Sequence, residues 1–344
     1  MLVVKSEGFQ LAKVFAFLSR YSIFVILICV FIASALLNNN FLSVINLTNV
    51  LRQNAVVCIL ALGVTMLIIS GTIDLSSGAV MAFSGVLAVF MYRLTGSLFV
   101  AFATGILIGV LFNCISGVLV AVCKIPPFIA TLAVMTAARG AALLFTMGQN
   151  ILQIGDFVIF GQGSLFSIPV PIIFMFFILV VTWYILNQTR FGRSLYAIGG
   201  NEEAANASGI RVARTKFLCY VINGSFVGLA GVIFMSRVNA GLPNAGQGFE
   251  FDALTAAVIG GTSFSGGIGT AMGTFAGAFI VGILGNIMNL LEINSYIQQI
   301  TRGAIIALAV IIDIYTKNRR ARPKALIVPQ NEKGQDSANK EASI

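Results

Sequence analysis

The sequence predicts an all-α integral membrane protein with about ten transmembrane helices. Apolar residues make up 58% of the chain and charged residues only 10%, whereas soluble domains carry roughly 25% charged residues. Apolar stretches long enough to span a bilayer, about 20 residues, recur throughout. A water-soluble fold cannot bury this much apolar surface. The ten predicted spans are 21–37, 49–70, 75–92, 98–121, 126–148, 168–186, 216–236, 251–264, 268–290 and 297–315.

The first and eighth spans carry features beyond their apolar length. Residues 1–20 form a weakly amphipathic, cytoplasmic lead-in to the first span. That span lacks a small-residue cleavage site before Asn38, so we do not expect a cleaved signal peptide. The eighth span is short and Gly-rich at its end. We expect it to be broken or re-entrant, because irregular backbone at membrane depth needs protein or water to satisfy it.

The basic residues predict the orientation of the chain. Of 21 Lys and Arg residues, three precede the first span, five lie in or beside residues 187–216, and seven follow residue 316. Cytoplasmic segments attract Lys and Arg, so we expect both termini and the 187–216 loop in the cytoplasm. With ten spans, both termini and the 187–216 loop lie on the same side of the membrane, which agrees with the distribution of basic residues. Most of these charges are expected to contact anionic lipid, and nucleic-acid binding explains them poorly.

The chain therefore divides into the lead-in, a transmembrane domain at 21–315 and a tail at 316–344. The tail is polar, contains Pro323 and Pro329, and is predicted to be disordered and cytoplasmic.

Several kinds of chemistry are missing from the sequence. It has no His, and its five Cys residues are scattered without metal-ligand spacing. It has no Gly-Lys dipeptide and therefore no phosphate-binding loop of the Walker type. If ATP powers this protein, another chain must hydrolyse it, and we do not expect this chain to be an enzyme.

A hydrophilic segment at 192–210, here called the island, interrupts the apolar chain. It predicts a two-turn helix that begins at an N-cap, Asn201, has Glu202 and Glu203 in its first turn, and closes at Gly209. So short a helix is unstable alone in water. It therefore needs a partner surface. On local chemistry, docking to a second protein and lying passively on the membrane are equally favoured.

A faint repeat relates residues 68–78 to residues 258–267, since both end a span in a Gly/Ser-rich bend. Transporter folds often contain such repeats, so an inverted repeat of spans 2–5 and 7–10 is expected. Small residues are also common wherever membrane helices pack closely.

Ionisable residues inside apolar segments are candidate functional sites by default. Asp74 follows the second span and fits a cap of the third. Arg139 lies in the fifth span and either lines a polar path or pairs with a carboxylate. Glu250 and Asp252 open the eighth span, where a helix N-terminus tolerates acids, and Arg302 fits snorkelling. For each, a structural role competes with substrate contact.

Five stretches together resemble a known family. They are the island and residues 71–78, 127–132, 249–253 and 258–269. With these motifs the chain resembles the permease subunits of bacterial ABC-type sugar importers, such as the ribose, galactose, arabinose, xylose and allose permeases. The resemblance covers residues 40 to 313 approximately. It is specific for the family but not for one sugar, and the tail after Tyr315 is longer than the family pattern.

The resemblance implies a division of labour at the bacterial inner membrane. A periplasmic sugar-binding protein delivers the sugar, two permease chains form the pathway, and a cytoplasmic ABC ATPase with two nucleotide-binding units drives transport. The permease needs no cofactor, since ATP binds to its partner. The island then holds a coupling helix that seats in a groove of the ATPase. The coupling residues are Gly199, Gly200, Asn201, Glu202, Glu203, Ala204, Ala205, Ser208 and Gly209.

A neutral sugar calls for hydrogen-bonding groups rather than charge along the path. The candidate path residues are Asp74, Asn113, Thr136, Arg139, Asn223, Glu250, Asp252, Asn286 and Asn289. The sequence selects none of them over the others, because the binding protein can supply affinity and selectivity.

Three alternatives stay open. The same architecture could carry a nucleoside, a branched-chain amino acid or a furanose-like signal molecule. An ion-coupled secondary transporter would need buried carboxylates or His, which are scarce here. A channel would need a pore motif, and none is visible.

Overall fold

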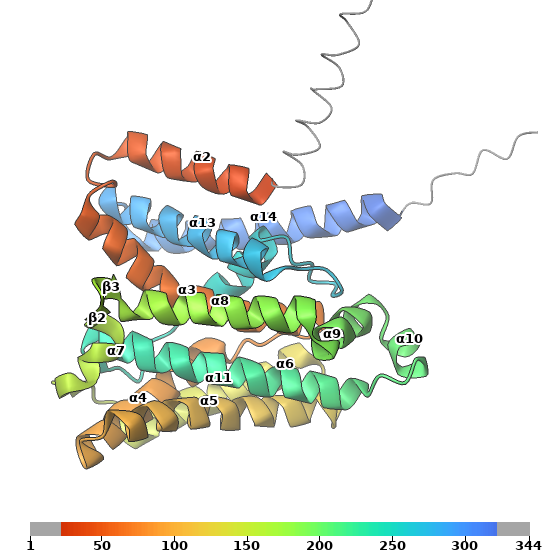
Figure 1. Cartoon of the computed structure of the whole chain (residues 1–344), viewed down its shortest axis with the longest axis horizontal. Coiled ribbons are helices and arrows are strands. Elements are labelled where there is room, and N and C mark those ends of the chain that lie inside the picture. Colours follow the sequence, from red (N-terminus) through yellow and green to blue (C-terminus); the bar gives the residue numbers. More distant parts are fainter. Residues whose placement is uncertain (1–21, 322–344) are drawn as a thin grey trace, which may run out of the picture.

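The computed structural model describes residues 22–321, and these are mostly helical (Figure 1). The lead-in at 1–20 and the chain beyond residue 321 lie outside the described residues. The long helices are α2 Ser22–Leu37, α3 Val44–Ile69, α4 Ser77–Thr95, α5 Leu98–Ala121, α6 Pro127–Thr146, α8 Val170–Gln188, α9 Arg190–Gly200, α11 Val212–Val238, α12 Phe249–Ile259, α13 Ala271–Leu290 and α14 Ser295–Ala321. The short elements are β1 Ile151–Leu152, η1 Gly155–Val158, α7 Ile159–Gln162, β2 Ser164–Leu165, β3 Ile168–Pro169, α10 Glu202–Ala207 and β4 Ala240–Gly241.

Ten helices follow the order of the ten predicted spans, but they are not equally suited to cross a bilayer. Within the described residues, seven are long and apolar enough: α3, α4, α5, α6, α8, α11 and α13. Helix α2 has 16 residues and α12 only 11, which agrees with the expected short eighth span. The count of ten therefore stays a prediction. Helix α14 continues to Ala321, so the predicted tail boundary at 316 falls inside a helix.

Helices α3 and α11 lie at the centre of the bundle. Every residue of α3 from 54 to 69 is buried, as is every residue of α11 from 226 to 236. Helix α5 packs against α11 at glycines, since a β-carbon on Gly109 would overlap the backbone of Gly224 and Gly228. Lipid gives helices no hydrophobic reason to associate, so close backbone contact between small residues supplies much of the packing energy.

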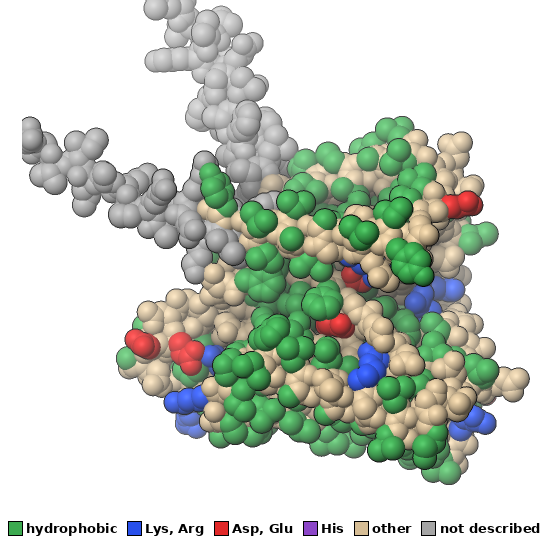
Figure 2. All heavy atoms as spheres, turned by 180° about the vertical axis from the view of Figure 1, so that it is seen from behind, with side chains coloured by type: hydrophobic (Ala, Val, Ile, Leu, Met, Phe, Trp, Pro, Cys, Tyr) green, Lys and Arg blue, Asp and Glu red, His purple; other side chains and the backbone are tan. Residues whose placement is uncertain are grey.

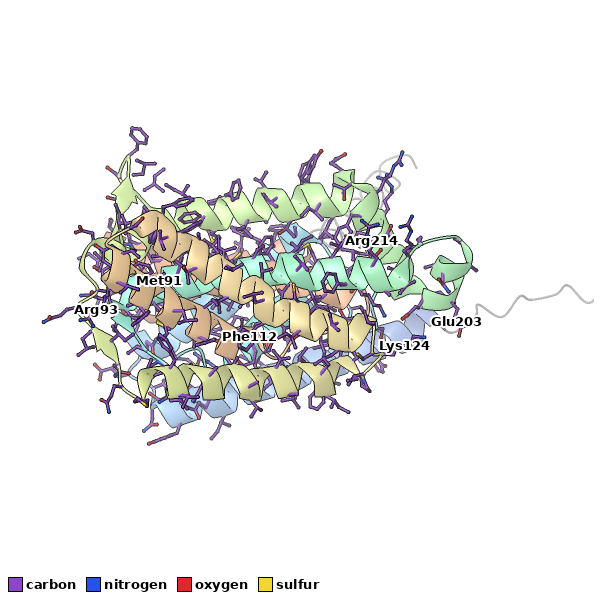
Figure 3. The ribbon with its side chains drawn as sticks, turned by 90° about the horizontal axis from the view of Figure 1, so that it is seen from below. Met91, Arg93, Phe112, Lys124, Glu203 and Arg214 are labelled. Carbon is purple, nitrogen blue, oxygen red and sulfur yellow. The ribbon has the colours of Figure 1, made fainter. Side chains whose placement is uncertain are left out.

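The two ends of the bundle hold different segments of the chain. One end, here called the island end, holds α9 and α10 together with the start of α2 and the end of α14 (Figure 1). Lys124, Glu203 and Arg214 also lie there, whereas Arg93 lies at the opposite end, here called the far end (Figure 3). Two short strand pairs, β1–β4 and β2–β3, lie in the segments between helices. The predicted arrangement, with both ends of the membrane domain beside the island, is thus present.

The two Gly/Ser-rich bends of the faint repeat have the same backbone structure. Gly71 after α3 has a φ of 77° and Gly261 after α12 has a φ of 87°. The two bends also lie together, because the amide of Gly267 donates to the carbonyl of Ile69 over 2.9 Å. Corresponding turns of an inverted repeat would lie at opposite ends. The bends therefore do not support the inverted repeat, which stays a prediction.

Candidate functional site

Helix α10 is built as the sequence predicts. The Asn201 side chain accepts a hydrogen bond from the amide of Ala204 over 2.9 Å, and both island carboxylates lie in the first turn. Gly209 ends the helix with a φ of 85°, and its amide donates to the carbonyl of Asn206 over 2.9 Å. A left-handed residue at this position is a common way to satisfy the last carbonyls of a helix.

Sequence reasoning missed α9, the helix that carries α10. Its N-cap is Thr189, whose hydroxyl accepts a hydrogen bond from the amide of Gly192 over 3.0 Å. Leu195 and Ile198 are buried and Arg193 is exposed, so the helix is amphipathic. The Thr189 cap followed by apolar residues three and four apart was the available signal. The island is therefore two helices rather than one.

The island sits on the bundle through glycines. A β-carbon on Gly199, in the last turn of α9, would overlap the carbonyl oxygen of Ile69 and the amide of Gly267. The backbone of Gly266 also packs against Gly199. These contacts, here called the glycine seat, join the island to the bends that follow α3 and α12. The Gly-rich motif at 258–269 contains Gly266 and Gly267, but the sequence alone does not show that they pack against Gly199.

A tyrosine adds a hydrogen bond beside the glycine seat. The Tyr196 hydroxyl donates to the carbonyl of Gly269 over 2.8 Å. Burial raises the pKa of the Tyr196 phenol, which keeps it a neutral donor. The seat is therefore held by close packing and by a directed hydrogen bond.

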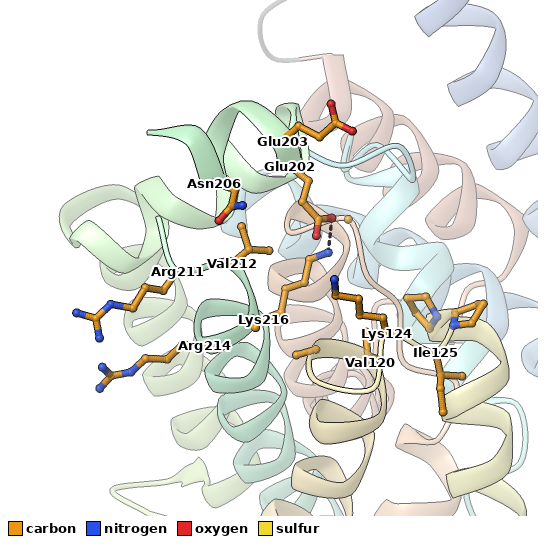
Figure 4. A pocket seen from close by; sticks show the side chains of 15 residues that line it. Val120, Lys124, Ile125, Glu202, Glu203, Asn206, Arg211, Val212, Arg214 and Lys216 are labelled. Atoms are coloured by element: carbon orange, nitrogen blue, oxygen red, sulfur yellow. Dashed lines mark hydrogen bonds and ion pairs between the residues drawn. The ribbon is translucent and has the colours of Figure 1, made fainter. Parts of the chain in front are cut away.

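Helix α10 has one buried position and a long exposed surface. Ala205 is only 4% exposed, so it packs against its own chain. The residues around it are exposed: Asn201, Glu202, Glu203, Ala204, Asn206, Ala207, Ser208 and Gly209. Beside α10 lies a groove of about 960 Å³, bounded on its other side by the turn between α5 and α6 (Figure 4). The exposed residues and the groove form a surface that a second protein can contact.

Three predicted path residues meet in one buried network. Asp74 accepts hydrogen bonds from the Ser76 amide and hydroxyl, the Ser77 hydroxyl and the Asn223 side chain, all over 2.6–2.8 Å. The Asn223 amide group also donates to Asn113 over 2.9 Å. The N-cap position of α4 is Ser76, so Asp74 is not the cap itself. It instead links the start of α4 to α5 and α11.

The charged path candidates occupy two further places. Arg139 donates to the carbonyls of Pro243 and Ala245, each over 2.7 Å. Asp252 lies 3.5 Å from Arg302, which joins α12 to α14. Acidic and basic side chains meet in a hollow on the face that Figure 2 shows.

The other path candidates have different partners. Glu250 is buried, accepts a hydrogen bond from the amide of Gly248 over 3.1 Å, and interacts electrostatically with Arg139. Asn286 exchanges two hydrogen bonds with Asn46, and Asn289 accepts from Gln298 over 2.9 Å. The hydroxyl of the exposed Thr136 donates to the carbonyl of Leu132 in the same helix over 3.0 Å. The candidates thus do not form a single site, and their role in the path stays a prediction.

The described residues show no metal centre. Within residues 22–321, no group of three or more His, Cys, Asp or Glu side chains is placed to hold a metal ion. The molecule is instead a bundle of apolar helices with an exposed polar surface at one end. This defines the class as a multi-pass membrane protein.

Comparison with known proteins gives the family. The family described as branched-chain amino acid transport system / permease component matches residues 46–310, and the chain belongs to it. The ribose import permease protein RbsC of Haemophilus influenzae is 40% identical over 325 residues, which cover 93% of this chain and all of that protein. RbsC of Bacillus subtilis is 43% identical over 282 residues, or 81% of this chain and 88% of that protein. The L-arabinose permease AraH of Escherichia coli is 36% identical over 302 residues, or 88% and 92%. No solved structure matches the chain.

Proposed function

We propose that this chain is the transmembrane subunit of an ATP-driven importer that moves a monosaccharide across the bacterial inner membrane. The observation that carries the proposal is identity of 36–43% over most of the chain to import permeases named for ribose, arabinose and allose. A periplasmic binding protein delivers the sugar, and a second permease chain completes the pathway. ATP hydrolysis occurs on a separate ABC ATPase, since this chain has no phosphate-binding loop.

In this proposal the island end faces the cytoplasm and α10 is the docking helix. Two observations support it: the basic residues gather around the island, and α10 exposes all but one of its positions. The glycine seat then transmits a movement of the ATPase to α3 and to the loop after α12.

Uptake into proteoliposomes tests the function. The purified chain, its ATPase and its binding protein are reconstituted, and labelled ribose, arabinose, allose, leucine and a nucleoside are offered with and without ATP. We expect ATP-dependent uptake of one pentose or hexose, and no ATP hydrolysis by this chain alone. Uptake of leucine would favour the amino-acid transport that the family description names. Uptake driven by an ion gradient without ATP would overturn the proposal.

Cysteine labelling tests the orientation. Ser208 is exposed on the island, so Ser208→Cys in a background without the five native Cys residues gives a single probe. An impermeant maleimide should fail to label it in intact cells and should label it after the membrane is opened. Ready labelling from outside would show the island in the periplasm.

A further inference from the structure

The groove beside α10 is lined by both apolar and charged residues. Val120 and Ile125 belong to its lining, together with Pro126 of the turn between α5 and α6. Four basic and two acidic side chains also line it: Lys124, Arg211, Arg214, Lys216, Glu202 and Glu203. A groove with both apolar and charged lining residues can accept an amphipathic segment.

Positive charge in the groove is not balanced by its own carboxylates. Glu202 pairs with Lys216 over 2.7 Å, and Lys124 points toward this pair without bonding to it (Figure 4). Arg211 and Arg214 point outward from the groove (Figure 4). Within residues 22–321, none of these three other cations has an ion pair. The groove is therefore complementary to an acidic partner.

The wall that carries Lys124 is fixed before any partner arrives. The amide of Cys123 donates to Val118 and that of Ile125 donates to Leu119, each over 3.0 Å. Lys124 has a φ of 55°, a left-handed conformation that glycine adopts more readily. The exposed lysine thus projects from an ordered turn, so little backbone freedom is lost when a partner binds it.

We propose that the ATPase docks at two places on this chain: on α10, and in the groove between α10 and the α5–α6 turn. The second place takes an amphipathic, acidic segment of the ATPase, with carboxylates beside Lys124, Arg211 and Arg214. This rests on the proposed function. In this arrangement the ATPase contacts the end of α5 and the start of α6 as well as the island, so its movement is transmitted to the bundle through both contacts.

The other occupants fit the groove less well. Residues 322–344 of this chain contain four Lys or Arg and three Asp or Glu, so they offer no excess negative charge. A lipid headgroup is anionic but would bring acyl chains to a groove that adjoins the protruding α10 rather than the flank of the bundle (Figure 1). A soluble acidic partner matches both the charge and the position.

Photo-crosslinking identifies the occupant directly. A benzoyl-phenylalanine replaces Lys124 in the complete transporter, expressed with its ATPase, and the adduct is mapped by mass spectrometry. We expect an adduct with an ATPase peptide that contains Asp or Glu. The same label at Arg93, on the far end, should give no ATPase adduct. Adducts at Lys124 only with lipid, with the tail of this chain or with a second permease copy would overturn the proposal.

Charge changes at Lys124 test the energetic contribution. Lys124→Glu should lower the ATPase retained per permease by about fivefold, the upper range for one exposed ion pair, and the loss should shrink in high salt. Lys124→Gly keeps the left-handed turn and removes the charge, so it should weaken retention while permease abundance stays normal. Arg190→Glu makes the same charge change at an exposed residue outside the groove lining and is the control.

The outcomes separate this inference from the function on which it rests. If wild-type permease retains no ATPase, the proposed function fails. If wild-type retains ATPase and both Lys124 variants retain it equally, with Arg190→Glu unchanged as well, the groove is not a docking site and only this inference fails.

Discussion

The two faces of the island are built by opposite means. On the face toward the bundle, Gly199 has no side chain, so its backbone packs directly against the backbone of Ile69 and Gly267. On the free face, residues such as Glu203 and Ala207 are exposed. At Gly199 the first face has no room for even a β-carbon, while the second face has room for a partner. In the proposed function, Gly199 belongs to a rigid joint with the bundle and the exposed side is the docking surface for the ATPase.

Gly199→Ala should break the joint and have the largest effect. Its β-carbon would overlap two backbone groups, which cannot yield as a flexible side chain can, and overpacking of this kind typically costs about 1–3 kcal/mol. Labelled-sugar uptake should fall to background. Gly200→Ala is the matched control, since its β-carbon would meet nothing within 4 Å. Equal uptake by the two variants would mean that the glycine seat does not carry the movement.

Ala205→Pro should break the docking helix without disturbing the bundle. The change removes the hydrogen bond from the Ala205 amide to the carbonyl of Asn201, now 3.0 Å long, and an interior Pro costs about 3 kcal/mol. The permease should remain in the membrane at near-normal abundance, because the spans pack independently of α10. Uptake and ATPase co-purification should both be lost. Normal transport by this variant would make the island a passive loop.

Ala207→Leu probes the free face alone. Ala207 is exposed, whereas Ala205 is buried against its own chain. Leu at 207 should therefore leave the melting temperature unchanged and lower ATPase retention by steric conflict with the partner. Leu at 205 should lower the melting temperature first, because its clash is internal. If Leu at 207 has no effect on retention, the ATPase does not cover this side of α10.

Local patterns in the sequence predict the parts of this molecule that depend on neighbours along the chain. The order of the helices follows from apolar runs, and α10 follows from Asn201, its acids and Gly209. The glycine seat does not, because Gly199 meets Ile69 and Gly267 only after the bundle has folded. Contacts between distant segments leave no periodic signal in one sequence.

The polar residues show the same limit. Asp74 and Asn223 were both predicted as path residues, but their hydrogen bond joins positions 149 residues apart. From the sequence, both are polar residues within or beside predicted spans, but the sequence does not show that they are hydrogen-bonded to each other. In the groove, Lys124 lies outside the three basic segments from which the sequence predicts the orientation of the chain. Its left-handed backbone and its position opposite α10 are products of the folded turn.

Glu202→Gln should have the smallest effect and sharpens the comparison of the two faces. The Glu202–Lys216 pair ties the free face of α10 to α11, but Glu202 is 58% exposed, and exposed pairs contribute about 0.2–1 kcal/mol. Glu203→Gln is the matched control, because it removes the same charge from the first turn of α10, and hence the same helix-dipole contribution, without an ion pair. Thermal melting in low salt should therefore show a slightly larger loss for Glu202→Gln than for Glu203→Gln, and high salt should erase the difference. Identical melting curves at low salt would show that the Glu202–Lys216 pair does not help to hold α10 in place.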